Sequence, residues 1–184
     1  MATERRDVVG MLAEVFREHG YEGASLALIS RATGLGKGSL YNMFPGGKDE
    51  MASSVLADVD GWFEANVFAR LRGEAEPAAG IGAMFDAVAT YFRSGRRTCL
   101  VGALALTDAR DRFGPAVNGY FARWVEALAG ALRRAGRSEA EAATLAEDIV
   151  GGIQGAIVLA RAVDDATVFE RVLARMRARV MQAR

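Results

Sequence analysis

Apolar side chains recur at steps of three and four residues along most of the chain, and this spacing predicts a succession of amphipathic helices. Residues 5–19 predict the first helix, which Gly20 ends. Residues 25–33 predict a second helix with Ser25 as its N-cap, and residues 37–44 predict a third. The chain is therefore expected to begin with three short helices, the last two joined by a glycine-bearing turn.

Further apolar stripes predict six more helices, over residues 48–71, 81–94, 99–107, 116–135, 138–163 and 165–181. Ser138 and Glu141 have the spacing of a capping box at the start of one of them. Proline occurs only 3 times, while alanine, leucine, arginine and glutamate are frequent, so helix is favoured over strand. The predicted fold class is all-α, with nine helices.

Two short helices joined by a glycine-bearing turn form a helix-turn-helix, whose second helix is shaped to enter a DNA major groove. Within residues 37–44, Leu40 and Phe44 are expected to face inward. The outward positions offer a positive charge, hydroxyl and amide groups, and close backbone approach; they are Lys37, Gly38, Ser39, Tyr41 and Asn42. An ordinary surface turn is the alternative, because similar helix pairs occur in proteins that never touch DNA.

The run GLGKGSLYNMFPGGKDEM, residues 34–51, resembles the TetR family of bacterial transcription regulators. The family pattern there is roughly G-V-S-K-G-T-L-Y-H-Y-F, followed by a lysine that opens the next helix. Gly36 and Asn42 depart from this pattern, and the PGGK loop carries one more residue than is common. The resemblance implies a helix-turn-helix domain over residues 1–47 and a ligand-binding and dimerisation domain over residues 48–184.

The resemblance also implies roles for residues and a function. Tyr41 and the helix-opening Lys48 match positions that commonly contact the DNA backbone in this family, and we expect Ser25 to hold a phosphate beside them. The expected function is a repressor that a small apolar or aromatic effector releases from a palindromic operator in double-stranded DNA. A regulator that senses electrophiles or oxidants through the thiol of Cys99 is an alternative.

The charge distribution fits a DNA partner better than the total charge does. Formal net charge is +0, whereas nucleic-acid-binding domains are often basic. Between Gly23 and Gly47, however, the charged residues are Arg31 and Lys37, both positive. The N-terminal segment lacks the apolar core of a signal peptide, and no run approaches the eighteen or so apolar residues that span a bilayer. We therefore expect a cytoplasmic protein with no membrane partner.

Aromatic side chains are spread over several of the helices predicted after residue 47. For any one of them a place in the core is the simpler interpretation, but together they could line a cavity for an apolar or aromatic molecule. The candidate pocket residues are Trp62, Phe63, Phe85, Tyr91, Phe92, Cys99, Tyr120, Phe121, Trp124 and Gln154. The thiol of Cys99 is itself open to two interpretations, a buried structural group or one activated by neighbouring arginines.

Small residues recur four apart in the helix predicted over residues 138–163, which costs helix propensity but allows another backbone to come close. The last predicted helix carries a regular apolar stripe. We expect these two helices to join two copies of the chain, because one recognition helix reads too few base pairs. The candidate interface residues are Gly152, Gly155, Ala156, Phe169, Leu173 and Met176.

Catalytic and metal-binding groups are scarce in the sequence. His19 is the single histidine and Cys99 the single cysteine, so a disulfide framework, a cysteine-rich zinc site and a Glu-x-x-His di-metal site are excluded. Neither residue has a visible partner for nucleophilic or acid–base catalysis. We expect no enzyme, catalytic residue, metal or cofactor. A helical ligand-binding or scaffold protein without DNA function remains the rival class.

Overall fold

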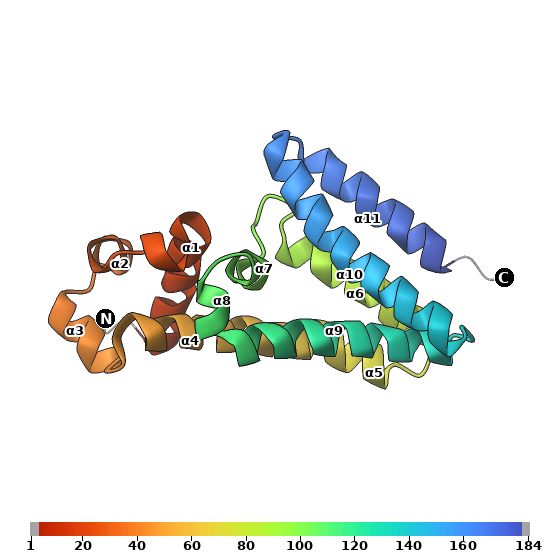
Figure 1. Ribbon diagram of the computed structural model, residues 1–184, viewed down its shortest axis with the longest axis horizontal. Coiled ribbons are helices and arrows are strands. Elements are labelled where there is room, and N and C mark those ends of the chain that lie inside the picture. The colour runs from red at the N-terminus through yellow and green to blue at the C-terminus, as the bar shows by residue number, and fades with distance from the viewer. Residues whose placement is uncertain (1–3, 182–184) are drawn as a thin grey trace. The chain divides into compact units, whose positions relative to one another are not determined.

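The computed structural model describes residues 4–181, which are helical with no strand among them (Figure 1). This confirms the all-α prediction. The chain forms two compact units: unit 1 comprises Met1–Gly61 and Leu100–Asn118, and unit 2 comprises Trp62–Cys99 and Gly119–Arg184. The division between the units therefore falls inside a helix, and the domain boundary expected after residue 47 stays a prediction.

Unit 1 begins with the three short helices that the sequence predicts. Helix α1 (Arg5–Gly23) is kinked at Gly20, the expected stop. Helix α2 (Leu26–Thr33) is capped by Ser25, whose Oγ accepts a hydrogen bond from the Leu28 amide at 3.3 Å. Gly34 ends α2 with a φ of 70°, a left-handed conformation that favours glycine.

Helix α3 (Lys37–Met43) follows this turn, and α4 (Gly47–Phe63) begins after a short loop. Unit 1 is completed by α7 (Leu100–Ala105) and α8 (Ala109–Arg112), which come from much later in the chain. Helix α8 was not among the nine predicted helices, because a helix of 4 residues is too short to show a repeating apolar pattern. The core of unit 1 contains buried side chains from α1 to α4 and α7, among them Leu12, Ile29, Leu40, Met51 and Leu104.

Unit 2 starts within the same long helix. Helix α4 passes without a break through a π-helical segment, η1 (Glu64–Phe68), into α5 (Ala69–Gly73), since Phe63 and Ala69 both keep helical dihedral angles. This agrees with the single helix predicted over residues 48–71. Helix α6 (Pro77–Tyr91) begins earlier than predicted because Pro77 suits the first helical turn.

The remaining helices are α9 (Gly114–Arg134), α10 (Glu139–Ala162) and α11 (Ala166–Met181). The predicted capping box is present: Ser138 Oγ accepts from the Glu141 amide at 3.3 Å, and Glu141 Oε2 accepts from the Ser138 amide at 3.2 Å. Helices α10 and α11 lie side by side in Figure 1, and both carry buried side chains, among them Ile153 and Ile157 of α10 and Phe169 of α11.

Candidate nucleic-acid interface

Helix α3 has one buried and one exposed face, as the sequence predicts. Leu40 and the following Phe44 have no exposed surface. The five candidate residues of the outward face, Lys37, Gly38, Ser39, Tyr41 and Asn42, are all exposed. Lys37 Nζ lies 5.9 Å from the centroid of the Tyr41 ring. The exposed face thus presents a positive charge, a hydroxyl, a phenol and an amide on one short helix.

The loop between α3 and α4 holds Tyr41 in place. Gly47 has a φ of 66°, and a Cβ atom added there would lie 3.4 Å from Tyr41 Cε1. The Gly47 amide also donates to the Phe44 carbonyl at 2.9 Å, which closes the loop. The Tyr41 ring therefore lies near Gly47, the first residue of α4, and a side chain at Gly47 would strain the loop because its φ is left-handed.

Ser25 and Lys48, the two expected phosphate contacts outside α3, already have partners within the protein. Ser25 Oγ caps α2 as an acceptor, and its hydroxyl hydrogen remains a possible donor. Lys48 Nζ donates to the Tyr21 carbonyl at 3.0 Å and lies 4.4 Å from the Tyr21 ring centroid. This structural role of Lys48 was not anticipated, and its contact with phosphate stays a prediction.

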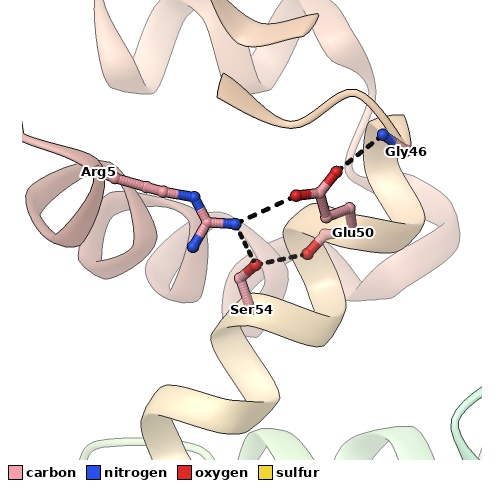
Figure 2. Close-up of polar contacts among 4 residues, drawn as sticks. All are labelled: Arg5, Gly46, Glu50 and Ser54. Atoms are coloured by element: carbon pink, nitrogen blue, oxygen red, sulfur yellow. Dashed lines mark hydrogen bonds and ion pairs between the residues drawn. The ribbon is translucent and has the colours of Figure 1, made fainter. Parts of the chain in front are cut away.

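Arg5, Glu50, Ser54 and the Gly46 amide form a polar network between α1 and the start of α4, which we call the Arg5 network (Figure 2). Arg5 Nη2 donates to Glu50 Oε1 at 3.2 Å and to Ser54 Oγ at 3.0 Å. Glu50 Oε2 accepts from the Gly46 amide at 2.8 Å, and Ser54 Oγ donates to the Glu50 carbonyl at 2.8 Å. The positive charge of Arg5 is therefore already paired.

A second network in unit 1 joins α8 to α4 and α1, and we call it the Asp49 link. The Tyr21 hydroxyl donates to Asp49 Oδ1, and Arg112 Nη1 donates to Asp49 Oδ2 at 2.6 Å. The Tyr21 ring meets the edge of Phe113 at a centroid distance of 5.2 Å. Sequence spacing gave no signal for this link, because Asp49 and Arg112 lie 63 positions apart.

The Asp49 link shifts the pKa values of its members. Burial and the hydrogen bond to Asp49 raise the pKa of Tyr21 to about 12. The hydrogen bonds from Tyr21 and Arg112 lower the pKa of Asp49. The pairing therefore favours neutral tyrosine and ionised aspartate at neutral pH, the protonation states that the hydrogen bonds require.

These shifts predict loss of stability at both pH extremes. Because the Asp49 pKa is lowered by folding, Asp49 stabilises the fold above about pH 4, and this contribution disappears as the pH falls through the folded pKa. Because the Tyr21 pKa is raised, its contribution is complete below about pH 10 and is lost as the pH rises through about 12. A tyrosinate absorbance titration should show one tyrosine with a pKa of about 12 that Tyr21→Phe removes. If Tyr21→Phe instead removed a tyrosine that titrates with an ordinary pKa, the result would contradict the Asp49 link.

The candidate pocket residues all lie in unit 2, and seven aromatic rings there form one cluster around Phe63. Phe63 has no exposed surface, and its ring centroid lies 4.8 to 6.1 Å from five other rings and 5.2 Å from Trp62. The members of this aromatic cluster are Trp62, Phe63, Phe68, Tyr91, Phe92, Tyr120 and Trp124. The structure thus brings six of the ten candidates together as packed neighbours.

The other four candidates, and one ring that sequence analysis missed, complete this picture. Phe121 is half-buried beside Tyr120, Phe85 and Cys99 are buried, and Gln154 Nε2 is a buried donor with no hydrogen-bond partner among residues 4–181. Phe68 was missed because it follows Phe63 by five positions. That is the spacing of the π-helical segment, which a 3.6-residue pattern does not detect.

The candidate interface residues divide into buried and open positions. Ala156, Phe169 and Leu173 are buried inside the protomer, with exposed fractions of 3%, 0% and 7%. A Cβ on Gly152 would lie 2.6 Å from Met176 Sδ, so this glycine accommodates Met176 of its own chain. The contact of these residues with a second copy stays a prediction. Gly155 is exposed, with open space around it.

Large apolar side chains are exposed on the last turns of α10 and at the residue that follows it. Val158, Leu159 and Val163 have exposed fractions of 64%, 49% and 55%. Within the described residues, α10 is also the helix long and apolar enough to cross a membrane by length and composition, with a mean hydropathy of 1.4 and 39% of that window buried. The sequence analysis did not foresee so apolar a helix.

Comparison with known proteins identifies the family. Residues 12–55 match "Bacterial regulatory proteins, tetR family". Residues 77–175 match "Transcriptional regulator LmrA/YxaF-like, C-terminal domain". The HTH-type transcriptional regulator LmrA of Bacillus subtilis (strain 168) is 25% identical over 167 residues, which make up 89% of each chain. These matches cover both the helix-turn-helix and most of unit 2.

Solved structures have the same fold. A TetR transcriptional regulator from Chloroflexus aurantiacus superposes with a TM-score of 0.80 at 25% identity, over 97% of this chain and 94% of that one. The TetR family regulator CifR, solved with a 26-base-pair double-strand operator, gives 0.77 at 26% identity, over 100% and 98% of the two chains. The chain therefore belongs to the tetR family of bacterial regulatory proteins, with an LmrA/YxaF-like C-terminal domain, and is a DNA-binding transcriptional regulator.

Proposed function

We propose that this regulator is a cytoplasmic repressor that leaves a palindromic operator when a small apolar or aromatic effector binds unit 2. The observation that carries the proposal is the path of α4. This helix begins beside Tyr41 in unit 1, and its last residue is Phe63, the centre of the aromatic cluster in unit 2. A change in the packing of the cluster therefore acts on the helix whose first residue, Gly47, follows the loop after α3.

The proposed DNA contacts follow from the exposed face of α3. Ser39 and Asn42 carry the hydrogen-bonding groups for base edges, while Lys37, Tyr41, Lys48 and Ser25 suit phosphates. Gly38 allows the helix backbone to come close to the groove. Two such helices in a homodimer read two half-sites about 34 to 36 Å apart. CifR, similar over its whole length, was solved with operator DNA, which supports the same partner here.

The aromatic cluster suits the proposed effector because it offers large apolar faces with few polar groups. Gln154 Nε2, a buried donor with no hydrogen-bond partner within residues 4–181, would be satisfied by an acceptor group of the effector. A ligand that prefers the DNA-incompetent arrangement by about 1 to 3 kcal/mol per coupled site lowers operator affinity about 5- to 150-fold. The operator must then weaken effector binding by the same factor.

The test is therefore reciprocal. An effector found by screening apolar and aromatic compounds for relief of operator binding is titrated by calorimetry into free protein and into the protein–operator complex. The proposal expects weaker binding to the complex by the factor measured for DNA release. Equal affinity for the free protein and for the complex would overturn it, because such a ligand does not shift the equilibrium between the two states. A response that Cys99→Ser abolishes, with DNA binding intact, would favour thiol sensing instead.

The homodimer gives a prediction at Gly155. Replacing Gly155 by leucine places a bulky side chain on the exposed face of α10, and association is expected to weaken about tenfold or more while the protomer stays folded. Gly10→Leu is the matched control, because Gly10 is another exposed helical glycine with open space, in unit 1. Sedimentation or light scattering across a concentration series measures both. An unchanged dimer in Gly155→Leu would contradict this interface.

A further inference from the structure

We propose that Arg5 is a positioning residue for operator binding: it acts through Glu50 on the loop between α3 and α4 and does not itself neutralise a phosphate. An exposed arginine at the N-terminus of a DNA-binding domain would ordinarily be taken as a phosphate contact. Here the guanidinium already has two acceptors, Glu50 Oε1 and Ser54 Oγ, at 3.2 and 3.0 Å. The proposal rests on the DNA-binding surface proposed above.

Glu50 connects Arg5 to the loop. One carboxylate oxygen meets Arg5, and the other accepts the Gly46 amide hydrogen at 2.8 Å (Figure 2). A Cβ on Gly46 would lie only 3.1 Å from Glu50 Cβ, so the acidic side chain is packed directly on the loop. The charge-assisted bond to Arg5 fixes the rotamer of Glu50 and thereby the position of the Gly46 amide.

Arg5 also contacts the end of the recognition helix. Its guanidinium carbon lies 4.6 Å from the centroid of the Phe44 ring, and Phe44 is the residue that ends α3. Arg5 therefore contacts one end of the loop directly, at Phe44. It acts on the other end, Gly46, through Glu50. The next residue, Gly47, supports the Tyr41 ring. The contacts form a continuous path from α1 to a proposed DNA-contacting side chain.

Electrostatics explains why this arrangement needs a cation. Glu50 is an acid in the first turn of α4, close in sequence to Lys48 and to the recognition helix. Without a paired cation its charge would repel an approaching phosphate backbone. The Arg5 network neutralises that charge and uses it as a structural bond. Arg5 thus supports DNA binding without adding to the number of phosphates that the protein neutralises.

The experiment is a double-mutant cycle with Arg5→Gln and Glu50→Gln, measured as operator affinity at several salt concentrations. Arg5→Gln is expected to weaken binding about 3- to 10-fold in the wild-type background, and less than about twofold in the Glu50→Gln background. The slope of log affinity against log salt should stay as in wild type. If Arg5 contacted a phosphate, Arg5→Gln would instead reduce the magnitude of this slope by about 0.9 per protomer. The loss of operator affinity would then be the same in both backgrounds. Either of those results would overturn the proposal.

Arg6→Gln is the matched control, since Arg6 is the adjacent exposed arginine, and its effect should add to that of Glu50→Gln. A second measurement needs no DNA. Hydrogen exchange of the Gly46 amide in the free protein should speed up in Arg5→Gln and stay unchanged in Arg6→Gln. Unchanged exchange in Arg5→Gln would overturn the positioning role even if operator binding behaved as expected. Failure to find an operator, with faster Gly46 exchange, would count against the proposed function alone.

Discussion

Replacing Phe63 by alanine is expected to lower the free energy of unfolding by about 3 to 5 kcal/mol. Phe63 has no exposed surface and contacts six other aromatic rings, so its removal leaves a cavity at the centre of the cluster. Chemical denaturation measures the loss. A decrease of this size is a large part of the stability of an ordinary domain, about 5 to 15 kcal/mol.

Phe121→Ala is the matched control for this prediction. Phe121 is only half-buried, and its ring contacts Tyr120 at the edge of the cluster, so the expected loss is less than about 2 kcal/mol. Equal losses in the two variants would show that Phe63 is not the centre of the packing. Phe63→Ala should also reduce the response of operator affinity to effector, because the last residue of α4 is no longer held by the cluster.

The double variant Ser39→Ala/Asn42→Ala is expected to lose about 2 to 6 kcal/mol of operator binding per protomer. A good base contact discriminates by about 1 to 3 kcal/mol, and in a homodimer each contact occurs twice. Both side chains are exposed, so the free energy of unfolding should change little. Fluorescence anisotropy on operator and on scrambled DNA separates the effects: affinity for the operator falls, while affinity for scrambled DNA stays the same.

The control for this variant is Ser53→Ala/Asn118→Ala. Ser53 and Asn118 are exposed polar residues of the same two types, and they lie in the same unit outside the helix-turn-helix. This control should bind operator as wild type does. If it loses as much affinity as the α3 variant, or if the α3 variant binds operator normally, the assigned recognition face is wrong.

Features that depend on short sequence distances were predicted well. The inward Leu40 and Phe44, the Ser25 cap and the Ser138 capping box all follow from spacings of three or four residues, which the helix geometry converts directly into contacts. The exposed face of α3 follows in the same way. Local periodicity therefore predicts which residues are free to meet a partner, and this part of the candidate site was available from the sequence.

Features that depend on packing between distant segments could not be predicted from the sequence. Arg112 meets Asp49 because α8 returns to unit 1, and no periodicity reports that return. Arg5 is paired with Glu50, which lies 45 positions away in the sequence. Gly152 accommodates Met176 of the same chain, an intramolecular role that the spacing of small residues did not indicate. In each case the sequence supplies the residue type, and the tertiary partner decides its role.

Selection of genomic DNA fragments by the purified protein, followed by footprinting of the enriched fragment, tests the central claim most directly. If two α3 faces of a homodimer read the operator, the protected sequence should be a palindrome. Its half-sites should lie one helical turn, about 34 to 36 Å, or a multiple of it apart, and Ser39→Ala/Asn42→Ala should enrich no such sequence. No enrichment beyond nonspecific binding, or protection of a single unpaired half-site, would contradict the account.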